Sequence, residues 1–466
     1  MKYAELFRLC GFEPAEIEKE SPRIEKAFRK FGIGDEDIKR AEGRIKEYYD
    51  VELMGVRKLL GVWMKELIAL ALCREEHRKV VYSEWPGVQN ILLMGAMHAA
   101  PDVYFGTPGS QTLNLVMGGI FDKLRPILEA GEETGLPAGS AHCALWQTHV
   151  GAIAKGLIPK PDLMISAGWY CDQPAEADQL LHELYGIPVV YLDGCLDWQW
   201  GEWPNIGTRQ IKYVAGKWAK VKQKVEEVIG REIPFEAERQ GLRDNAKLFY
   251  NFNTLVELVG KADPQPVSQT VTDLVYWMSY TPLQNREEAN EAVTLLCKEV
   301  KQRVDQGKGV LPKGAPRVYF GLRIAVDPGI LRMVEDVGLS MPIIFVDWLT
   351  PQERQKTSSV ATPEKVMEGL FRRGCLCSAS GAIDYFAEYC KAWNVDGAIL
   401  CYPYSCRPYT IPPLMAKKAI KERLGIPVMV LEGDAYDTRQ YSAGALRTRV
   451  ETFAELLKAR KAATAA

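Results

Sequence analysis

Cysteine is the residue type in this sequence that offers the most chemistry. The 466-residue chain contains eleven cysteines and only five histidines. Neither a C-x₂-C pair nor a histidine pair at zinc-finger spacing is present, so a structural zinc site is weakly supported. The compact bacterial ferredoxin motif is also absent. The cysteines are therefore either small buried hydrophobes or soft thiolate ligands, and scattered thiolates suit an iron–sulfur cluster.

Seven of the cysteines are expected at one functional edge. In parallel sheets, the loops that leave the strands' carboxyl ends and the starts of the helices that follow share an edge, where ligands bind. Four of the seven follow predicted strands, namely Cys171, Cys195, Cys401 and Cys406. The other three precede or begin helices that lead back to a strand, namely Cys143, Cys375 and Cys377. All seven are candidate ligands of a cluster between two lobes.

The seven candidates are not equivalent. If Ser140 is the N-cap of a helix, Cys143 lies in its first turn, where the N–H groups and the dipole favour a thiolate. Cys401 is adjacent to its strand and could instead face the core. Cys375 and Cys377 are one residue apart, which limits how both can reach one iron. The other cysteines lie within amphipathic helical patterns and are interpreted as core residues, namely Cys10, Cys73, Cys297 and Cys390.

The elements that must position these cysteines alternate in type. Short β-branched runs alternate with helical stretches in two blocks, which favours parallel sheets covered on both faces. The fold class expected is α/β, with two Rossmann-like lobes. The predicted strands are residues 80–83, 103–106, 163–166, 189–192, 318–322, 343–346, 398–400 and 428–431. The predicted divisions are an N-terminal helical region 1–77, a first lobe 78–215, a helical segment 216–314 and a second lobe 315–466.

Charge and hydropathy exclude several classes of function. With 58 basic and 60 acidic side chains, the net charge of −2 provides no general attraction for nucleic acid or for an anionic membrane surface. The N-terminus has no apolar signal region, and no stretch approaches ~18 consecutive apolar residues. We therefore expect a cytoplasmic protein whose cysteines remain thiols.

Two histidines lie about two turns apart on the helix predicted to contain Cys143. Histidine titrates near neutrality, so either His142 or His149 could deliver a proton to a reduced substrate. His142 is adjacent to a candidate ligand and is taken as the candidate catalytic residue. His149 is interpreted as a structural helix histidine.

Several segments resemble the 2-hydroxyacyl-CoA dehydratase/benzoyl-CoA reductase superfamily. The more specific ones are in the C-terminal half, namely residues 396–408, 424–432, 434–437 and 446–453. The N-terminal ones are His142-Cys143, residues 160–163 and residues 169–172. The resemblance spans roughly residues 78–460 in order.

The resemblance implies a cubane cluster bound by Cys143, Cys171 and Cys406. The further cysteines at the same edge resemble those of the double-cubane cluster proteins of the superfamily, where each cubane needs three thiolates. The extra ligands would come from Cys195, Cys375, Cys377 and Cys401, one more than required. The resemblance also implies a homodimer, a small-molecule substrate, oxygen sensitivity and electrons from a separate ATP-hydrolysing iron–sulfur activator. The chain itself has no G-x-x-x-x-G-K-[ST] or G-x-G-x-x-G motif.

Three functions are therefore open. The favoured one is an oxidoreductase that reduces a small molecule at a double-cubane [8Fe-9S] cluster. The second is a subunit of a 2-hydroxyacyl-CoA dehydratase with a single [4Fe-4S] cubane. The third is a non-catalytic two-lobed binding protein with buried cysteines, which would be colourless and stable in air.

Overall fold

The computed structural model shows how these elements are arranged. It describes residues 1–84, 88–137, 142–168, 171–193, 202, 207–321, 327–344, 364–365, 368, 379–410 and 412–465. Cys195, Cys375 and Cys377 lie outside the described residues. Among the described residues, no helix is long and apolar enough to cross a membrane.

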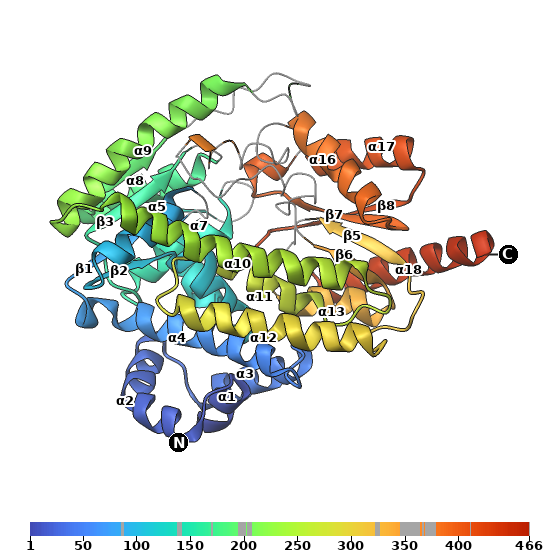
Figure 1. Ribbon diagram of the computed structural model, residues 1–466, viewed down its shortest axis with the longest axis horizontal. Helices are drawn as coiled ribbons and strands as arrows, with labels where there is room; N and C mark the ends of the chain where they lie inside the picture. Colours follow the sequence, from blue (N-terminus) through green and yellow to red (C-terminus); the bar gives the residue numbers. More distant parts are fainter. Residues whose placement is uncertain are drawn as a thin grey trace.

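Two four-stranded parallel sheets confirm the predicted α/β architecture. The first has the order β2-β1-β3-β4 and the second the order β6-β5-β7-β8, so the two lobes share one topology. The strands are β1 (Lys79–Tyr82), β2 (Val103–Gly106), β3 (Leu163–Ala167), β4 (Val189–Leu192), β5 (Arg317–Gly321), β6 (Ser340–Ile343), β7 (Gly397–Pro403) and β8 (Val428–Gly433). Figure 1 shows the two sheets in opposite halves of the molecule.

Only β6 departs clearly from its predicted position. The apolar run favours a strand at 343–346, of which residues 345 and 346 lie outside the described part of the chain. Pairing with β5 begins earlier, at Ser340, which lies opposite Arg317. β6 is an edge strand and contains Pro342, which an edge position tolerates. Its position is therefore determined by pairing with β5, which the apolar run does not reveal.

Helices surround both sheets. The N-terminal ones are α1 (Ala4–Leu9), α2 (Pro14–Phe31), α3 (Asp35–Tyr48) and α4 (Met54–Glu76). The first lobe adds α5 (Val88–Ala99), the π-helix η1 (Pro108–Ile120), α6 (Arg125–Thr134), α7 (Ala144–Ala154) and α8 (Gln173–Tyr185). The second lobe has α13 (Pro328–Asp336), α16 (Ala379–Ala392), the 3₁₀ turns η3 (Arg407–Tyr409) and η4 (Thr438–Gln440), α17 (Pro412–Leu424) and α18 (Ala443–Ala465).

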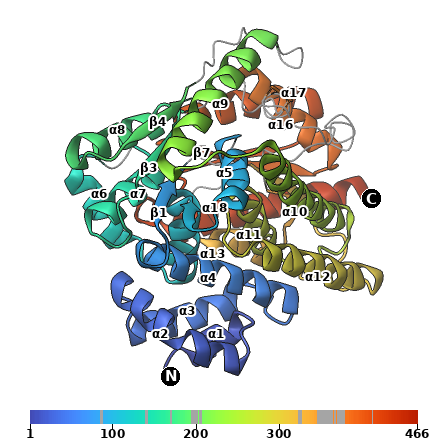
Figure 2. The same ribbon diagram turned by 60° about the vertical axis from the view of Figure 1, so that its left-hand side comes forward.

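A helical segment joins the two lobes. It consists of α9 (Thr208–Ile229), α10 (Phe235–Lys261), α11 (Gln269–Tyr280) and α12 (Arg286–Asp305). Figures 1 and 2 show α10 and α12 running side by side, with α4 and the other N-terminal helices beyond them. The predicted boundaries at 77 and 314 fall between elements, whereas the one at 215 falls inside α9. The division into domains stays a prediction.

One apolar core runs through the N-terminal helices, the first sheet and the helical segment. Every residue of α11 is buried, so this helix lies within the interior and not on the surface. A second, smaller core lies between one face of the second sheet and α13 and α18. The larger core also reaches the other face of the second sheet, and therefore ties the lobes together.

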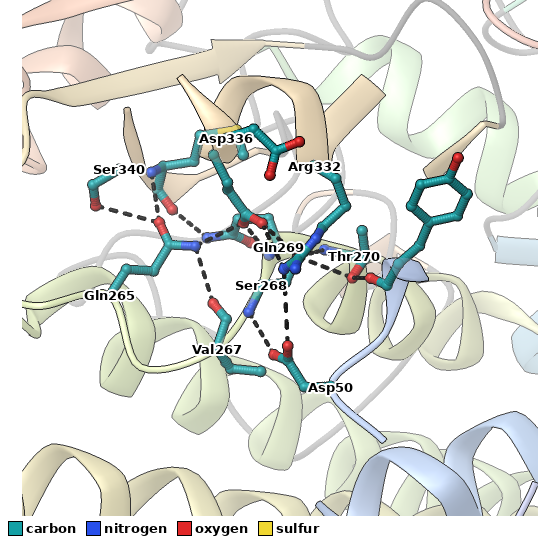
Figure 3. Close-up of polar contacts among 12 residues, drawn as sticks. Asp50, Gln265, Val267, Ser268, Gln269, Thr270, Arg332, Asp336 and Ser340 are labelled. Atoms are coloured by element: carbon teal, nitrogen blue, oxygen red, sulfur yellow. Dashed lines mark hydrogen bonds and ion pairs between the residues drawn. The ribbon is translucent and has the colours of Figure 1, made fainter. Parts of the chain in front are cut away.

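A buried polar network fixes the start of α11 against the second lobe (Figure 3). The carboxyl group of Glu335 on α13 accepts hydrogen bonds from the backbone N–H of Gln269 at 2.8 Å, the Ser268 hydroxyl at 2.7 Å and the Gln265 amide at 2.8 Å. Asp50 accepts from the backbone N–H of Ser268 at 2.7 Å. Burial raises the pKa of Glu335 to about 7, although the donors oppose this shift. Because these neighbours donate hydrogen bonds, the network requires an acceptor at position 335.

We expect Glu335→Gln to destabilise the protein by about 2 kcal/mol. The amide keeps the shape of the side chain but directs an N–H₂ group at groups that donate hydrogen bonds. The measurement is the free energy of unfolding in urea. Asp336→Asn, at the exposed neighbour on the same helix, is the matched control and should change it by less than about 0.5 kcal/mol. Equal losses in both variants would contradict this role for Glu335.

Candidate metal centre

Three of the candidate ligands lie at the carboxyl edges of the two sheets, as predicted. Cys171 follows β3 and lies two residues before the first residue of α8. Cys406 follows β7 and is the N-cap residue of η3. Cys143 is the N-cap residue of α7, with extended backbone at φ −68° and ψ 135°. The prediction that Cys143 lies in the first turn of this helix is therefore wrong, because the helix begins one residue after it. Ser140, the predicted N-cap, lies outside the described residues.

Two of the three thiols are buried, the third is half-buried, and they influence one another electrostatically. The relative exposure of Cys143 is 6% and that of Cys171 is 8%, while Cys406 is half-buried. Burial raises the pKa of all three, and it raises that of Cys171 to about 12. Cys406 and Cys171 add to the shift at Cys143, and Cys171 adds to the shift at Cys406. Thiols crowded in this way disfavour several negative charges together unless a cation binds among them.

Each sulfur also accepts a hydrogen bond from a nearby backbone N–H. The donors are Leu145 for Cys143, Gln173 for Cys171 and Tyr409 for Cys406. These bonds lower the thiol pKa and so oppose the effect of burial. Leu145 and Gln173 lie in the first turn of a helix, where backbone N–H groups lack helical partners. The N–H of Tyr409 also donates to the carbonyl group of Cys406 at 3.0 Å. Hydrogen bonds to sulfur are among the factors that set the potential of an iron–sulfur cluster.

Gln173 links all three cysteine-bearing segments, a role that sequence analysis did not predict. Its side-chain oxygen accepts from the backbone N–H of Cys143 at 3.2 Å, and its side-chain nitrogen donates to the backbone carbonyl of Ser405 at 3.0 Å. The side chain has no exposed surface. The only signal in the sequence is its position two residues after Cys171. Gln173 thus connects the two lobes where the thiols meet.

Asp434 adds a carboxyl group near the thiols. It follows β8, has a relative exposure of 2% and raises the pKa of both Cys143 and Cys406. The Ser405 hydroxyl donates to its Oδ2, and the backbone N–H groups of Tyr436 and Asp437 donate to its Oδ1 at 2.7 and 3.0 Å. These bonds hold the loop that carries Cys406 onto the end of β8.

Ion pairs between the lobes surround this junction. Arg407, next to Cys406, pairs with Asp172 and with Glu176, the latter at 3.0 Å. Arg439 pairs with Glu132 of the first lobe and with Asp437 of its own. Partly exposed pairs contribute modestly to stability, but they fix the orientation of one loop relative to the other.

His142 lies next to Cys143 and is half-buried. Its Nδ1 is 3.7 Å from a carboxylate oxygen of Glu176, and burial lowers its pKa despite that carboxylate. His149 is on the helix that follows, has no exposed surface and is paired with carboxylates.

Cys401 is not brought together with the other three cysteines. It lies within β7, and neighbouring strand residues face opposite sides of a sheet. It belongs to the smaller apolar core against α18, and burial raises its pKa. We therefore leave it out of the proposed ligand set. Cys73 and Cys390 are buried within helices and Cys297 is partly buried within α12, as predicted. Cys10 is also buried, but it is the C-cap residue of α1 and lies just past the end of that helix. All eight described cysteines are free of disulfide bonds.

Among the described residues, no three His, Cys, Asp or Glu side chains are grouped tightly enough to hold one metal ion. In a cubane each thiolate binds a different iron, so the sulfurs lie further apart than the ligands of one ion do.

Comparison with known proteins identifies the family. The family described as 2-hydroxyglutaryl-CoA dehydratase, D-component, matches residues 95–457, which is more than three quarters of the chain. The chain belongs to this family. The matched segment includes Cys143, Cys171, Cys406 and Gln173.

The similar curated proteins are subunits of dehydratases and of a reductase. The alpha subunit of (R)-2-hydroxyglutaryl-CoA dehydratase from Acidaminococcus fermentans is 23% identical over 65% of this chain and 61% of its own length. A subunit of benzoyl-CoA reductase from Thauera aromatica is 23% identical over 85% and 94%. The (R)-phenyllactyl-CoA dehydratase alpha subunit of Clostridium sporogenes is 21% identical over 70% and 78%. The match thus covers about three fifths of the first relative and nearly all of the second.

We expect Gln173→Ala to loosen the junction of the three segments. Loss of two buried hydrogen bonds should cost about 2 kcal/mol of unfolding free energy and expose Cys143 more often. The measurements are urea unfolding and the rate at which Cys143 reacts with a thiol reagent in the metal-free chain. Gln179→Ala, at an exposed glutamine of α8, is the control. An unchanged thiol reaction rate in Gln173→Ala would rule out the proposed linking role.

Proposed function

We propose that the protein is the iron–sulfur component of an ATP-dependent reductase related to 2-hydroxyacyl-CoA dehydratases and benzoyl-CoA reductase. The observation that carries the proposal is the convergence of Cys143, Cys171 and Cys406 from two lobes, each with a backbone N–H on its sulfur. Family membership supports an enzyme component of this kind. The substrate class is a small molecule that accepts low-potential electrons.

A double-cubane cluster is the favoured cofactor. Two cubanes joined by a bridging sulfide need three protein thiolates each. With Cys401 assigned to the core, the remaining candidates number six. The three beyond the described junction are Cys195, Cys375 and Cys377. The single [4Fe-4S] alternative needs only Cys143, Cys171 and Cys406.

The electrons would come from a separate iron–sulfur activator that hydrolyses ATP. The chain has no phosphate-binding loop of its own, which supports a partner as the site of hydrolysis. A homodimer in the cytoplasm completes the proposal. The net charge of −2 per chain offers no field for nucleic acid or an anionic membrane.

The chain's own residues would hold and shield the reducing centre. The cluster would supply low-potential electrons and, at an iron with an open position, a Lewis acid. Cys143, Cys171 and Cys406 would bind it, while Gln173 keeps their segments in register. His142, half-buried beside Cys143 and facing Glu176, would hold a proton for the reduced substrate.

Iron and acid-labile sulfide per chain test the cluster assignment. Protein purified without oxygen should contain about eight irons and slightly more sulfide if the cluster is a double cubane. About four irons would favour the single-cubane dehydratase subunit, which would also require a second, different subunit. A colourless protein without iron would contradict both proposals and leave the non-catalytic binding protein.

We expect His142→Gln to lower turnover by about 100-fold and to leave the iron content unchanged. A general acid contributes roughly 10²–10⁴-fold to a rate, whereas a structural histidine would change metal binding or stability instead. The measurements are activator-driven substrate reduction and iron per chain. His98→Gln, at an exposed histidine of α5, is the control. Full activity in His142→Gln would eliminate His142 as the proton donor.

A further inference from the structure

The helix that Cys143 begins also carries a buried ion triad that the proposed function has not used. His149 on α7 lies between two carboxylates, with its Nδ1 2.9 Å from Glu84 and its Nε2 3.5 Å from Asp178. The relative exposures are 0% for His149, 2% for Glu84 and 1% for Asp178. Charged groups are almost never buried so completely unless they are paired. The fold therefore keeps these three charged groups together in its interior despite a considerable desolvation cost.

The three residues come from elements that also position the thiols. Glu84 follows β1 at the carboxyl edge of the first sheet, Asp178 is on α8 and His149 is on α7. Cys143 is the N-cap of α7, and Cys171 lies two residues before the start of α8. Two contacts therefore connect α7 and α8. One is the hydrogen bond from the backbone of Cys143 to Gln173, and the other is the ion pair between His149 and Asp178.

The backbone at the start of η1 packs closely against the triad. The backbone N–H of Gly109, at the start of η1, donates to Glu84 at 3.1 Å. A Cβ at position 109 would lie 2.8 Å from Glu84 Oε2 and 2.8 Å from the Cβ of His149. Only glycine therefore fits between the carboxylate and the helix, and the Glu84–His149 pair is held by backbone on its other side.

The groups that face the imidazole favour its charged form. Glu84 faces it from the loop after β1 and Asp178 from α8, while η1 contributes the uncharged Gly109. α6 packs against α7 through Gly131, next to the backbone of Gln147. Burial alone would lower the pKa of His149, but the two carboxylates reverse this and raise it to about 10.

We propose that His149 is a permanent imidazolium that acts as a positioning residue, clamping α7 to α8 and placing a fixed positive charge on the helix that Cys143 begins. The effect of His149 on a cluster rests on the proposed function, whereas the charge of His149 does not. Because a nearby cation stabilises the more reduced, more negative cluster, it raises the midpoint potential. The two carboxylates have the opposite effect and lower the midpoint potential.

The charge is tested first by NMR of the histidine rings in the full-length chain, with and without cluster. The signal lost in His149→Gln identifies His149 among five histidines. Both ring nitrogens should stay protonated from about pH 6 to about pH 9. Titration near the ordinary value of about 6.5 would overturn the proposal.

The electrostatic role is tested by potentiometry of the oxygen-free holoprotein. His149→Gln should shift the midpoint potential to more negative values, whereas Glu84→Gln and Asp178→Asn should shift it to more positive values. A purely structural triad would give shifts of the same sign, or none, and that result would overturn the role. Glu183→Gln, which removes an exposed charge from α8, should cause no shift because solvent screens it.

The remaining outcomes are also decisive. Where His149→Gln does not fold, Asp178→Asn keeps the shorter His149–Glu84 pair and tests the role through the opposite, positive shift. If the chain binds no iron, the proposed function fails while the NMR result still decides the charge. The clamp is then tested by the thiol reactivity of Cys143 in Asp178→Asn, which should rise, and an unchanged rate would contradict the clamp.

Discussion

The arrangement of the candidate site depends on a single buried glutamine. Gln173 donates its backbone N–H to the sulfur of Cys171, accepts from the backbone of Cys143 and donates to the backbone of Ser405, next to Cys406. An amide is suited to this role because it offers one acceptor and one donor group without charge. A carboxylate at the same position could not donate to the carbonyl, and an apolar residue would leave two buried backbone groups without these partners.

This junction can be precise because the rest of the molecule holds the lobes in place. The larger apolar core extends from the N-terminal helices to one face of the second sheet. Away from the site, Glu335 fixes the start of α11 to α13, and Asp50 fixes it to the N-terminal region. Arg407 and Arg439 add ion pairs across the lobes near the thiols. Apolar burial supplies the stability, and the polar contacts select one orientation of the lobes.

Charge is distributed unevenly around the thiols. Asp434 and the carboxylates of the triad are negative, whereas His149 and Arg407 are positive, and the sulfurs receive backbone N–H groups. In a buried site these charges are screened much less than they would be on the surface. A site of this kind can tune a bound cluster by small changes in which side chain is charged.

The sequence by itself determined the fold class, the positions of seven of the eight strands and the edge at which the cysteines meet. These follow from local patterns, because a β-branched run predicts a strand and the carboxyl ends of parallel strands share an edge. Cys143, Cys171 and Cys406 were placed together by that rule alone. Only the tertiary structure decided that Cys401 belongs to the apolar core against α18, that β6 starts at Ser340 and that Gln173 and Asp434 belong to the site. Side-chain direction, strand pairing and hydrogen bonds between distant segments depend on contacts across the fold, which no local pattern encodes.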